Sequence, residues 1–168
     1  MPIISIIVAL DNNRAIGLNN NLLWHISDDL KRFKALTTGH TVIMGRRTFD
    51  SLPKRPLPNR RNIVLTHNPS FQYEGVDVVQ SVQQCFELIS SYPSDDEVFI
   101  IGGSSIYEAF LPFTQRIYAT HVHHSFQADA FFPSIDSGVF LVQEQTPLTV
   151  DEKSNLTYNY TTYIRKND

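Results

Sequence analysis

The sequence has few of the features that mark secreted or membrane proteins. Its 168 residues include one cysteine, Cys85, which cannot form an internal disulfide and so favours a reducing, cytoplasmic compartment. No apolar run approaches the length of a membrane span. The first run, 3–10, has no preceding basic region and no cleavage-site pattern, so it predicts a buried strand. The length and a hydrophobic content of 42% favour one well-packed unit, and we expect residues 1–168 to form a single domain.

Metal-binding and nucleophilic patterns are also lacking. His121, His123 and His124 come closest to a metal site, and the first two share a strand face. No further ligands follow at a spacing that metal sites use, so we expect surface histidines at a strand end and no bound metal. Ser104 and Ser105 have no His and Asp arrangement for nucleophilic catalysis.

The net charge of −3 is unevenly distributed along the chain. The segment 30–61 has nine basic residues against one acidic residue and carries +8, whereas the remainder carries −11. A cationic patch on an acidic protein favours a discrete anionic ligand. The basic residues come in pairs, without the pattern of a recognition helix or an aromatic platform, so we expect no nucleic-acid partner.

Apolar runs alternate with helical segments along most of the chain. This order predicts an α/β fold in which a largely parallel sheet is covered by helices on both faces. A late alternating segment predicts an antiparallel addition at the edge of the sheet. The expected strands are residues 3–10, 41–44, 62–66, 76–79, 98–101, 116–122 and 156–164. The expected helices are residues 28–37, 47–51, 82–91 and 105–110.

Asp29 is the most informative residue of the first expected helix. Ser27 is placed to cap that helix, and Leu30 and Phe33 mark its apolar side. Asp29 falls on this side, whereas Asp28 points to solvent. An unpaired ionised carboxylate is costly to bury, so an inward Asp needs a donor, a cation or a function. The alternative is an acid that only favours the helix N-terminus through the macrodipole.

A glycine pair marks one strand-to-helix junction. Gly102 and Gly103 follow an apolar strand and precede a short helix. Glycines allow a ligand to approach the main chain closely, and the start of a helix offers unpaired N–H groups to an anion. A plain tight turn is the alternative, and the motif is not the dinucleotide fingerprint with three spaced glycines.

A second junction joins strand and helix through Gly45, Arg46, Arg47 and Thr48. Two guanidinium groups and a hydroxyl can bind one phosphate. An arginine near a ribose is the usual way to accept a 2′-phosphate, so the pattern favours NADP over NAD. The alternative is a solvated basic helix start, although cations there oppose the helix dipole unless an anion binds.

A third basic patch spans residues 55–62. Its prolines stiffen the turn, and Leu57 supplies an apolar wall. Arg60 can hold a carboxylate through two parallel hydrogen bonds, so a carboxylate-bearing substrate would fit this patch.

These motifs, in this order and spacing, resemble the bacterial-type dihydrofolate reductases over essentially the whole chain. The resemblance is carried by residues 6–9, 16–17, 24–30, 33–34, 42–48, 55–60, 101–103, 107 and 120–133. It implies that family's fold, a central mixed, mostly parallel eight-stranded sheet flanked by about four helices, with a C-terminal antiparallel hairpin. It also implies a cytoplasmic monomer that binds NADPH, dihydrofolate and antifolate inhibitors.

The resemblance implies roles for individual residues. Asp29 matches the active-site carboxylate that holds the pterin, Trp24 helps to order nearby water, and Leu22 lies in an expected lid, residues 17–23. Positions matching the substrate site are Ile7, Val8, Asp29, Leu30, Phe33, Leu52, Leu57, Arg60, Ile101, Tyr107 and Thr120. Positions matching the cofactor site are Ala9, Ile16, Gly17, Gly45, Arg46, Arg47, Thr48, Thr66, His67, Ile101, Gly102, Gly103, Ser104, Ser105 and Tyr107.

The reaction implied by the resemblance is hydride transfer from NADPH to C6 of 7,8-dihydrofolate, with protonation at N5, to give tetrahydrofolate. Asp29 is expected across the pterin ring from N5, so a water beside N5 is the expected proton donor and Asp29 tunes the ring. The lid excludes water from the reacting groups. The Gly102–Gly103 peptide is expected to be cis.

Several positions depart from the family pattern. Leu23 replaces a usual proline, Ala128 precedes Asp129 where glycine is usual, and Ser105 stands where some relatives have arginine. These changes are expected to alter rates or inhibitor fit more than the chemistry. Two rival functions remain, a reductase of another pterin-like or pyrimidine substrate, as in riboflavin synthesis, and a non-catalytic NADP-binding module.

Overall fold

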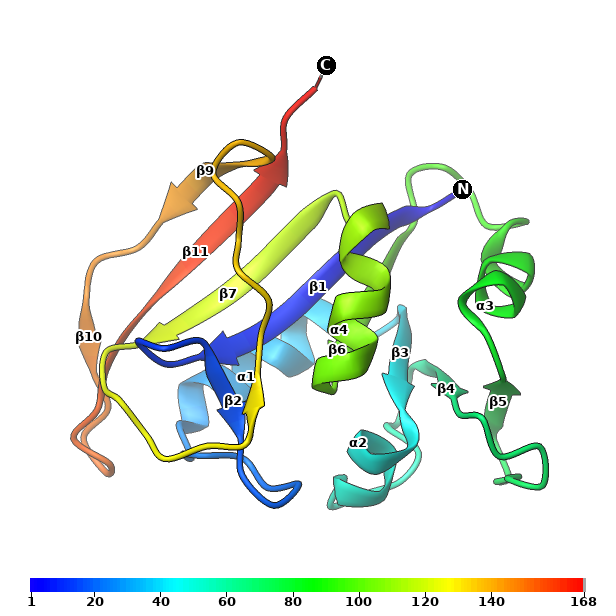
Figure 1. Ribbon diagram of the computed structural model, residues 1–168, viewed down its shortest axis with the longest axis horizontal. Coiled ribbons are helices and arrows are strands. Elements are labelled where there is room, and N and C mark those ends of the chain that lie inside the picture. Colours follow the sequence, from blue (N-terminus) through cyan, green and yellow to red (C-terminus); the bar gives the residue numbers. More distant parts are fainter. Residues whose placement is uncertain (168) are drawn as a thin grey trace.

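A central sheet organises the fold in the computed structural model, which describes residues 1–167 (Figure 1). The strands are β1 (Ile3–Leu10), β2 (Ala15–Gly17), β3 (Thr41–Gly45), β4 (Arg61–Leu65), β5 (Val76–Val79), β6 (Glu97–Gly102), β7 (Arg116–Val122), β8 (Ala130–Phe131), β9 (Phe140–Gln145), β10 (Thr149–Val150) and β11 (Thr157–Arg165). The helices are α1 (Ser27–Thr37), α2 (Arg46–Ser51), α3 (Val82–Ile89) and α4 (Ser104–Phe110), followed by a short 3₁₀ turn, η1 (Leu111–Phe113).

The sheet is mixed and mostly parallel, as the sequence predicts. Eight strands follow the order β10-β11-β7-β1-β6-β3-β4-β5, and β9 joins them by pairing with β11. Strand β1 pairs in parallel with β6 and β7, and β3 pairs in parallel with β4 and β6. Strand β11 is antiparallel to β7, β9 and β10. The antiparallel C-terminal part is therefore confirmed, with β11 between β7 and the outer strands.

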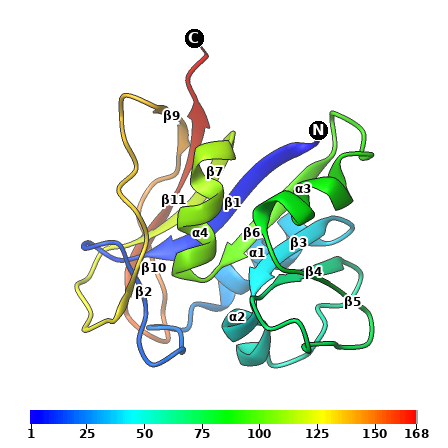
Figure 2. The ribbon, with the colours of Figure 1, turned by 45° about the vertical axis from the view of Figure 1, so that its right-hand side comes forward.

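Helices cover both faces of the sheet (Figures 1 and 2). Helices α3 and α4 pack with Ile4, Ile6 and Val8 of β1 in one buried cluster. Phe49 of α2 packs with Phe99 and their neighbours in a second cluster, on the opposite face. This arrangement follows from the apolar composition of β1, β3, β4 and β6, because a strand buried on both faces carries apolar residues at nearly every position. Cys85 lies in the first cluster and is buried.

The predicted helices and long strands all form, with ends displaced by a few residues. One detail was wrong. Ser27 does not cap α1, because it is the first helical residue, while Ile26 is the extended N-cap and no side chain caps the helix. The buried Ile26 side chain holds the chain at this point, so packing rather than capping defines where the helix begins.

Four strands were not predicted, namely β2, β8, β9 and β10. They are short or polar, and their residues pair with distant partners: β2 with β8, β9 with β11, and β10 with β11. Strand β9 is exposed at five of its six positions. Such segments carry little apolar periodicity, so only pairing reveals them. No helix within residues 1–167 is long and apolar enough to cross a membrane.

Candidate active site

The Asp29 carboxylate lies where α1 faces β7. Asp28 is exposed and Asp29 is half-buried, as the helical spacing predicted. The Thr120 hydroxyl donates a hydrogen bond of 2.6 Å to Asp29 Oδ1. Burial raises the pKa of the Asp29 carboxyl, while this hydrogen bond and the positive charge of Arg32 oppose the rise. The site therefore holds a carboxyl whose charged form is disfavoured by desolvation and partly restored by two neighbours.

Arg32 was not recognised from the sequence as part of this region. It follows Asp29 by one helical turn, and its guanidinium lies 4.0 Å from the centre of the Tyr160 ring. The Arg32 guanidinium therefore lies between α1 and β11, where its positive charge lowers the pKa of Asp29. Its i, i+3 spacing from Asp29 is the signal from which the pairing could have been inferred.

Tyr107 of α4 lies near Asp29 and contacts β1. Its ring is buried, and its hydroxyl donates a hydrogen bond of 2.8 Å to the Ile7 carbonyl. Burial, with the negative charge of Asp29 as a lesser cause, raises the Tyr107 pKa. The phenol is therefore neutral at physiological pH. The Tyr107 hydroxyl therefore donates to the main chain of β1 near the Asp29 side chain of α1.

An apolar wall extends from Asp29 along the same face of the sheet. Ile7, Leu52, Leu57 and Ile101 are partly buried against the cluster around Phe49. Leu30 is 45% exposed, and Phe33 is half-buried. The structure thus brings together four of the residues assigned to the substrate wall, namely Ile7, Leu52, Leu57 and Ile101.

Val8 is placed differently from the expectation. Successive side chains of a strand point to opposite faces, so Val8 turns away from Ile7. It is 3% exposed and packs in the cluster under α3 and α4. Only the main chain of Val8 remains on the side of the site, so a wall role for its side chain was wrong.

Arg60 lies at the other end of the wall, held by the loop before β4. Its Nε donates to the Pro58 carbonyl at 2.8 Å, and one terminal nitrogen donates to the Thr37 hydroxyl at 3.1 Å. The loop itself is shaped by Asn62, which is 1% exposed and exchanges two 3.0 Å hydrogen bonds with the main chain of Leu57. Thr37 and Asn62 are positioning residues that sequence reasoning missed.

The glycine junction between β6 and α4 closely approaches two other elements. The Gly102–Gly103 peptide is cis, as expected. Gly102 has φ of +120°, and a Cβ there would contact the Tyr107 ring and hydroxyl at 3.2 to 3.3 Å. A Cβ on Gly103 would lie 3.4 Å from the Thr48 hydroxyl of α2. A side chain at Gly102 would therefore press on Tyr107 of α4, and one at Gly103 would fill the space beside Thr48 of α2.

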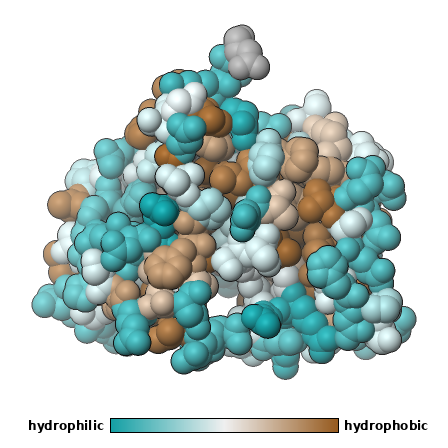
Figure 3. Space-filling view, in the orientation of Figure 1, coloured by the Kyte–Doolittle hydropathy of each residue, from teal (hydrophilic) through white to brown (hydrophobic). Residues whose placement is uncertain are grey.

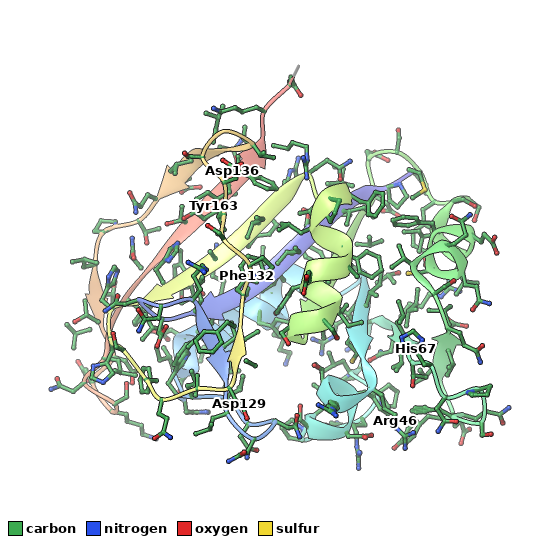
Figure 4. The ribbon with its side chains drawn as sticks, in the orientation of Figure 1. Arg46, His67, Asp129, Phe132, Asp136 and Tyr163 are labelled. Carbon is green, nitrogen blue, oxygen red and sulfur yellow. The ribbon has the colours of Figure 1, made fainter. Side chains whose placement is uncertain are left out.

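The basic residues of the second junction lie at the start of α2. Arg46 is exposed, with its guanidinium 4.6 Å from the centre of the Phe71 ring and its Nε 3.5 Å from Asp50. Arg47 is exposed. Figure 4 shows Arg46 and His67 on the same side of the molecule, near the ends of β3 and β4. Thr66 and Ser104 are half-buried, and His67 and Ser105 are exposed.

The expected lid follows β2 and lies near the loop before β8. Asn19 N–H donates to the Asp129 carboxylate at 3.0 Å, and Asp129 N–H donates to the Gly17 carbonyl at 3.0 Å. Contacts between lid and loop are therefore present despite Ala128. Leu22 is 75% exposed, and the Trp24 ring packs 5.2 Å from the Phe126 ring. Ile16 packs against the α4 side of the core, and Ala9 is half-buried at the end of β1.

These parts surround one hollow of the surface. Figure 3 shows it below the first turn of α4, between the segment after β2 and helix α2. Asp129 lies on one side of this hollow and Arg46 on the other (Figure 4). The three histidines of the possible metal site lie on and just after β7: His121 bonds the Tyr163 hydroxyl at 2.9 Å, and His123 and His124 are exposed. No cluster of three metal-ligating side chains occurs in the described part of the chain.

Several known proteins are similar to this chain over nearly its whole length. A sequence model described as dihydrofolate reductase matches residues 3–165. A Bacillus subtilis protein named dihydrofolate reductase is 42% identical over 98% of this chain and 95% of its own length. A Staphylococcus aureus protein of the same name is 41% identical over 97% of this chain and 98% of its own length.

A solved structure is similar throughout. It is described as dihydrofolate reductase from Enterococcus faecalis complexed with NADP(H) and RAB-propyl. It superimposes with a TM-score of 0.90 at 39% sequence identity, and the match covers 98% of this chain and 97% of that one.

Proposed function

The chain belongs to the dihydrofolate reductase family and reduces 7,8-dihydrofolate to 5,6,7,8-tetrahydrofolate with NADPH, and we propose that the residues between Asp29 and Arg60 bind the substrate for this reaction. The product supplies one-carbon metabolism. The observation that carries the assignment is the half-buried Asp29, hydrogen-bonded to Thr120 at one end of an apolar wall. A folate has a donor-rich ring, an apolar middle and a carboxylate tail. These three parts match Asp29, the apolar wall and Arg60, in that order.

Asp29 anchors and tunes the pterin ring. Its free oxygen can accept from a donor edge of the ring, since Thr120 occupies Oδ1. Burial raises the pKa of the Asp29 carboxyl, and this desolvation supports a ligand that supplies hydrogen bonds to it. Asp29 does not itself pass the proton to N5. A water at the edge of the ring does so, while the negative charge of Asp29 favours the protonated ring.

Arg60 receives the carboxylate at the far end of the substrate. Its guanidinium is oriented by Thr37 and Pro58, which leaves donor groups free for a two-pronged contact. The orientation is set before binding, so little side-chain entropy is lost when a carboxylate arrives. Ile7, Leu52, Leu57 and Ile101 bind the apolar middle of the substrate.

The residues around the hollow fit NADPH. Gly102 and Gly103 leave open a space that Cβ atoms would occupy, next to Thr48 and the first turn of α4. Arg46, Arg47 and Thr48 would hold the 2′-phosphate, with Thr66 and His67 nearby, and Gly45, Ser104 and Ser105 would bind the remaining phosphates through main chain and hydroxyls. When bound, NADPH supplies the hydride that the substrate accepts at C6.

The lid excludes water from the reacting groups. Residues 17–23 are tethered to the loop before β8 through Asp129, and Trp24 continues from the lid into a packed position against Phe126. Leu22 would cover the nicotinamide from the exposed side, and Trp24 would order the water near N5.

We further propose that the protein acts as a cytoplasmic monomer without a nucleic-acid partner. A net charge of −3 and the concentration of basic residues in one segment support a small anionic ligand rather than a polyanion. The single buried cysteine suits a reducing compartment.

A direct assay tests the proposal against its two rivals. The loss of NADPH absorbance on adding dihydrofolate is expected, with NADH a much poorer donor because it lacks the 2′-phosphate. The pyrimidine intermediate of riboflavin synthesis is the control substrate. Turnover of that compound but not of dihydrofolate would favour the rival reductase, and binding of NADPH without turnover of either would favour a non-catalytic module.

A further inference from the structure

Asp11 is a buried carboxylate to which the proposed function assigns no role. It follows directly after β1 and is 4% exposed. Among residues 1–167 it is the only Asp, Glu, Lys or Arg that is buried. A carboxylate is costly to bury, so it needs hydrogen-bond donors around it. The segments that supply these donors indicate the role of Asp11.

The donors of Asp11 come from two separate segments. The Oδ1 atom accepts from the N–H groups of Asn13 and Ala15, each at 2.8 Å, and so closes the turn from β1 into β2. The Oδ2 atom accepts from the N–H of Phe126 at 2.8 Å, across 115 residues of sequence. The next residue, Asn12, donates its N–H to the His124 carbonyl at 3.0 Å. One carboxylate therefore joins the entrance of the lid to the loop after β7.

The Phe126 segment in turn contacts the exit of the lid. The Phe126 ring packs 5.2 Å from the Trp24 ring and 4.6 Å from the His124 ring. Trp24 and Phe126 pack together against the buried cluster of Ile26 and Val122. Asp11 thus holds the strand that leads into the lid with one oxygen. The other oxygen holds the main chain of Phe126, whose ring supports Trp24.

We propose that Asp11 is a positioning residue for hydride transfer, which holds both ends of the lid so that Trp24 and the lid cover the reacting groups. The proposal rests on the proposed function for its effect on rate. Its structural part, the support of Trp24 through Phe126, does not depend on that function. Asp129 tethers the middle of the lid, whereas Asp11 fixes its two ends from inside the protein.

Asp11→Asn separates the two attachments. An amide presents one oxygen and one NH2 group, so it cannot accept on both sides. Keeping the two hydrogen bonds from Asn13 and Ala15 requires the NH2 group to face the Phe126 N–H, and the link between the segments is lost. The matched control is Asp136→Asn. Asp136 accepts from Gly138 N–H at 2.8 Å, but within its own exposed turn, away from the lid (Figure 4).

Two readouts test the proposal on the full-length protein. Trp24 is the only tryptophan, so the emission of the ligand-free protein reports its surroundings directly. We expect Asp11→Asn to shift this emission to the red and to lower kcat about tenfold per active site, counted by titration with a tight-binding antifolate. The KM for dihydrofolate should change less than about twofold, because Asp29 and Arg60 are untouched. Asp136→Asn should change neither readout.

Phe126→Leu keeps the main-chain hydrogen bond but removes the ring under Trp24, so it should reproduce the red shift and the fall in kcat even if Asp11→Asn fails to fold. Unchanged emission and kcat in a folded Asp11→Asn, or in Phe126→Leu, would overturn the proposal. If the wild type itself does not oxidise NADPH with dihydrofolate, the proposed function fails. The emission shift then still decides whether Asp11 supports Trp24.

Discussion

The two charged ends of the proposed substrate site, Asp29 and Arg60, are built alike and solvated differently. Each charge meets a threonine hydroxyl: Thr120 donates to Asp29 at 2.6 Å, and Thr37 accepts from Arg60 at 3.1 Å. At Asp29, burial dominates and raises the pKa of the carboxyl. At Arg60, burial likewise disfavours the charged form, and here it lowers the pKa of the guanidinium. This group is nevertheless near the surface, and its Nε donates to the Pro58 carbonyl.

Because of this difference, we expect the Asp29 end to contribute to the reaction and the Arg60 end to contribute to substrate affinity. The pKa of a carboxyl that is largely desolvated and has few donors changes strongly when a ligand binds or is protonated, because few other groups compensate its charge. An arginine near solvent keeps its charge throughout the physiological range and contributes mainly to affinity. We therefore expect changes at the Asp29 end to alter kcat and pH dependence, and changes at the Arg60 end to alter KM.

Asp29→Asn should have the largest effect. It keeps the shape and the hydrogen bond from Thr120 but removes the charge that favours the protonated pterin. We expect kcat at neutral pH to fall on the order of 100-fold, the lower range for a group that assists proton transfer. Steady-state NADPH oxidation measures this, with Asp28→Asn on the exposed side of α1 as the control. Near-normal turnover at neutral pH would contradict the role of Asp29.

Arg60→Lys should raise the KM for dihydrofolate about tenfold and leave kcat within about twofold, because an ammonium cannot form the two-pronged contact. Arg61→Lys is the matched control, since Arg61 points to Asp77 at 2.7 Å and to Tyr92. A fall in kcat without a rise in KM would place Arg60 with the chemistry and remove the contrast between the two ends.

Asp29→Asn should be more stable than the wild type at neutral pH, although it is expected to be less active. The folded-state pKa of Asp29 is raised above that of the unfolded chain, so ionisation of the carboxyl disfavours the folded state. Stability is lost as pH rises through the raised pKa, and the loss is absent below the unfolded pKa. Ligand-free Asp29→Asn should therefore resist urea better than the wild type at neutral pH. The gap should close as pH falls below about 3.9.

Thr120→Val should move the pH dependence without removing activity. The lost hydrogen bond favoured the charged carboxylate, so the pKa of Asp29 rises further. The midpoint of kcat/KM against pH that reports Asp29 should therefore shift upward. Thr161→Val is the matched control, because the buried Thr161 hydroxyl has no hydrogen-bond partner among residues 1–167. Equal shifts in both variants would argue against a specific effect of the Thr120 hydroxyl.

Thr37→Val should have the smallest effect. Arg60 loses one orienting hydrogen bond and keeps the one to Pro58, so the KM for dihydrofolate should rise only about threefold, with no change in the pH profile. Binding of dihydrofolate in the absence of cofactor, measured by Trp24 fluorescence, checks this. A shift in the pH profile comparable to that of Thr120→Val would mean that the two ends are not independent.

Local pattern was enough to predict the main elements of this fold. The apolar runs of β1, β3, β4, β6 and β7 and the helical spacing of α1 and α3 are properties of neighbouring residues. The inward direction of Asp29 also followed from spacing within one helix. The short or exposed strands β2, β8, β9 and β10 escaped prediction, because their pairing energy comes from partners elsewhere along the chain.

The charged residues, the glycine pair and their order along the chain follow from the residues alone, because these are local properties of the chain. Which of these residues meet depends on the fold. Thr120 reaches Asp29 across 91 residues, Tyr107 reaches Ile7 across 100, and Asp11 reaches Phe126 across 115. The face to which Val8 turns was likewise decided by how β1 packs. Such contacts depend on strand order and on which face each helix covers, and both follow from burying the whole apolar surface at once.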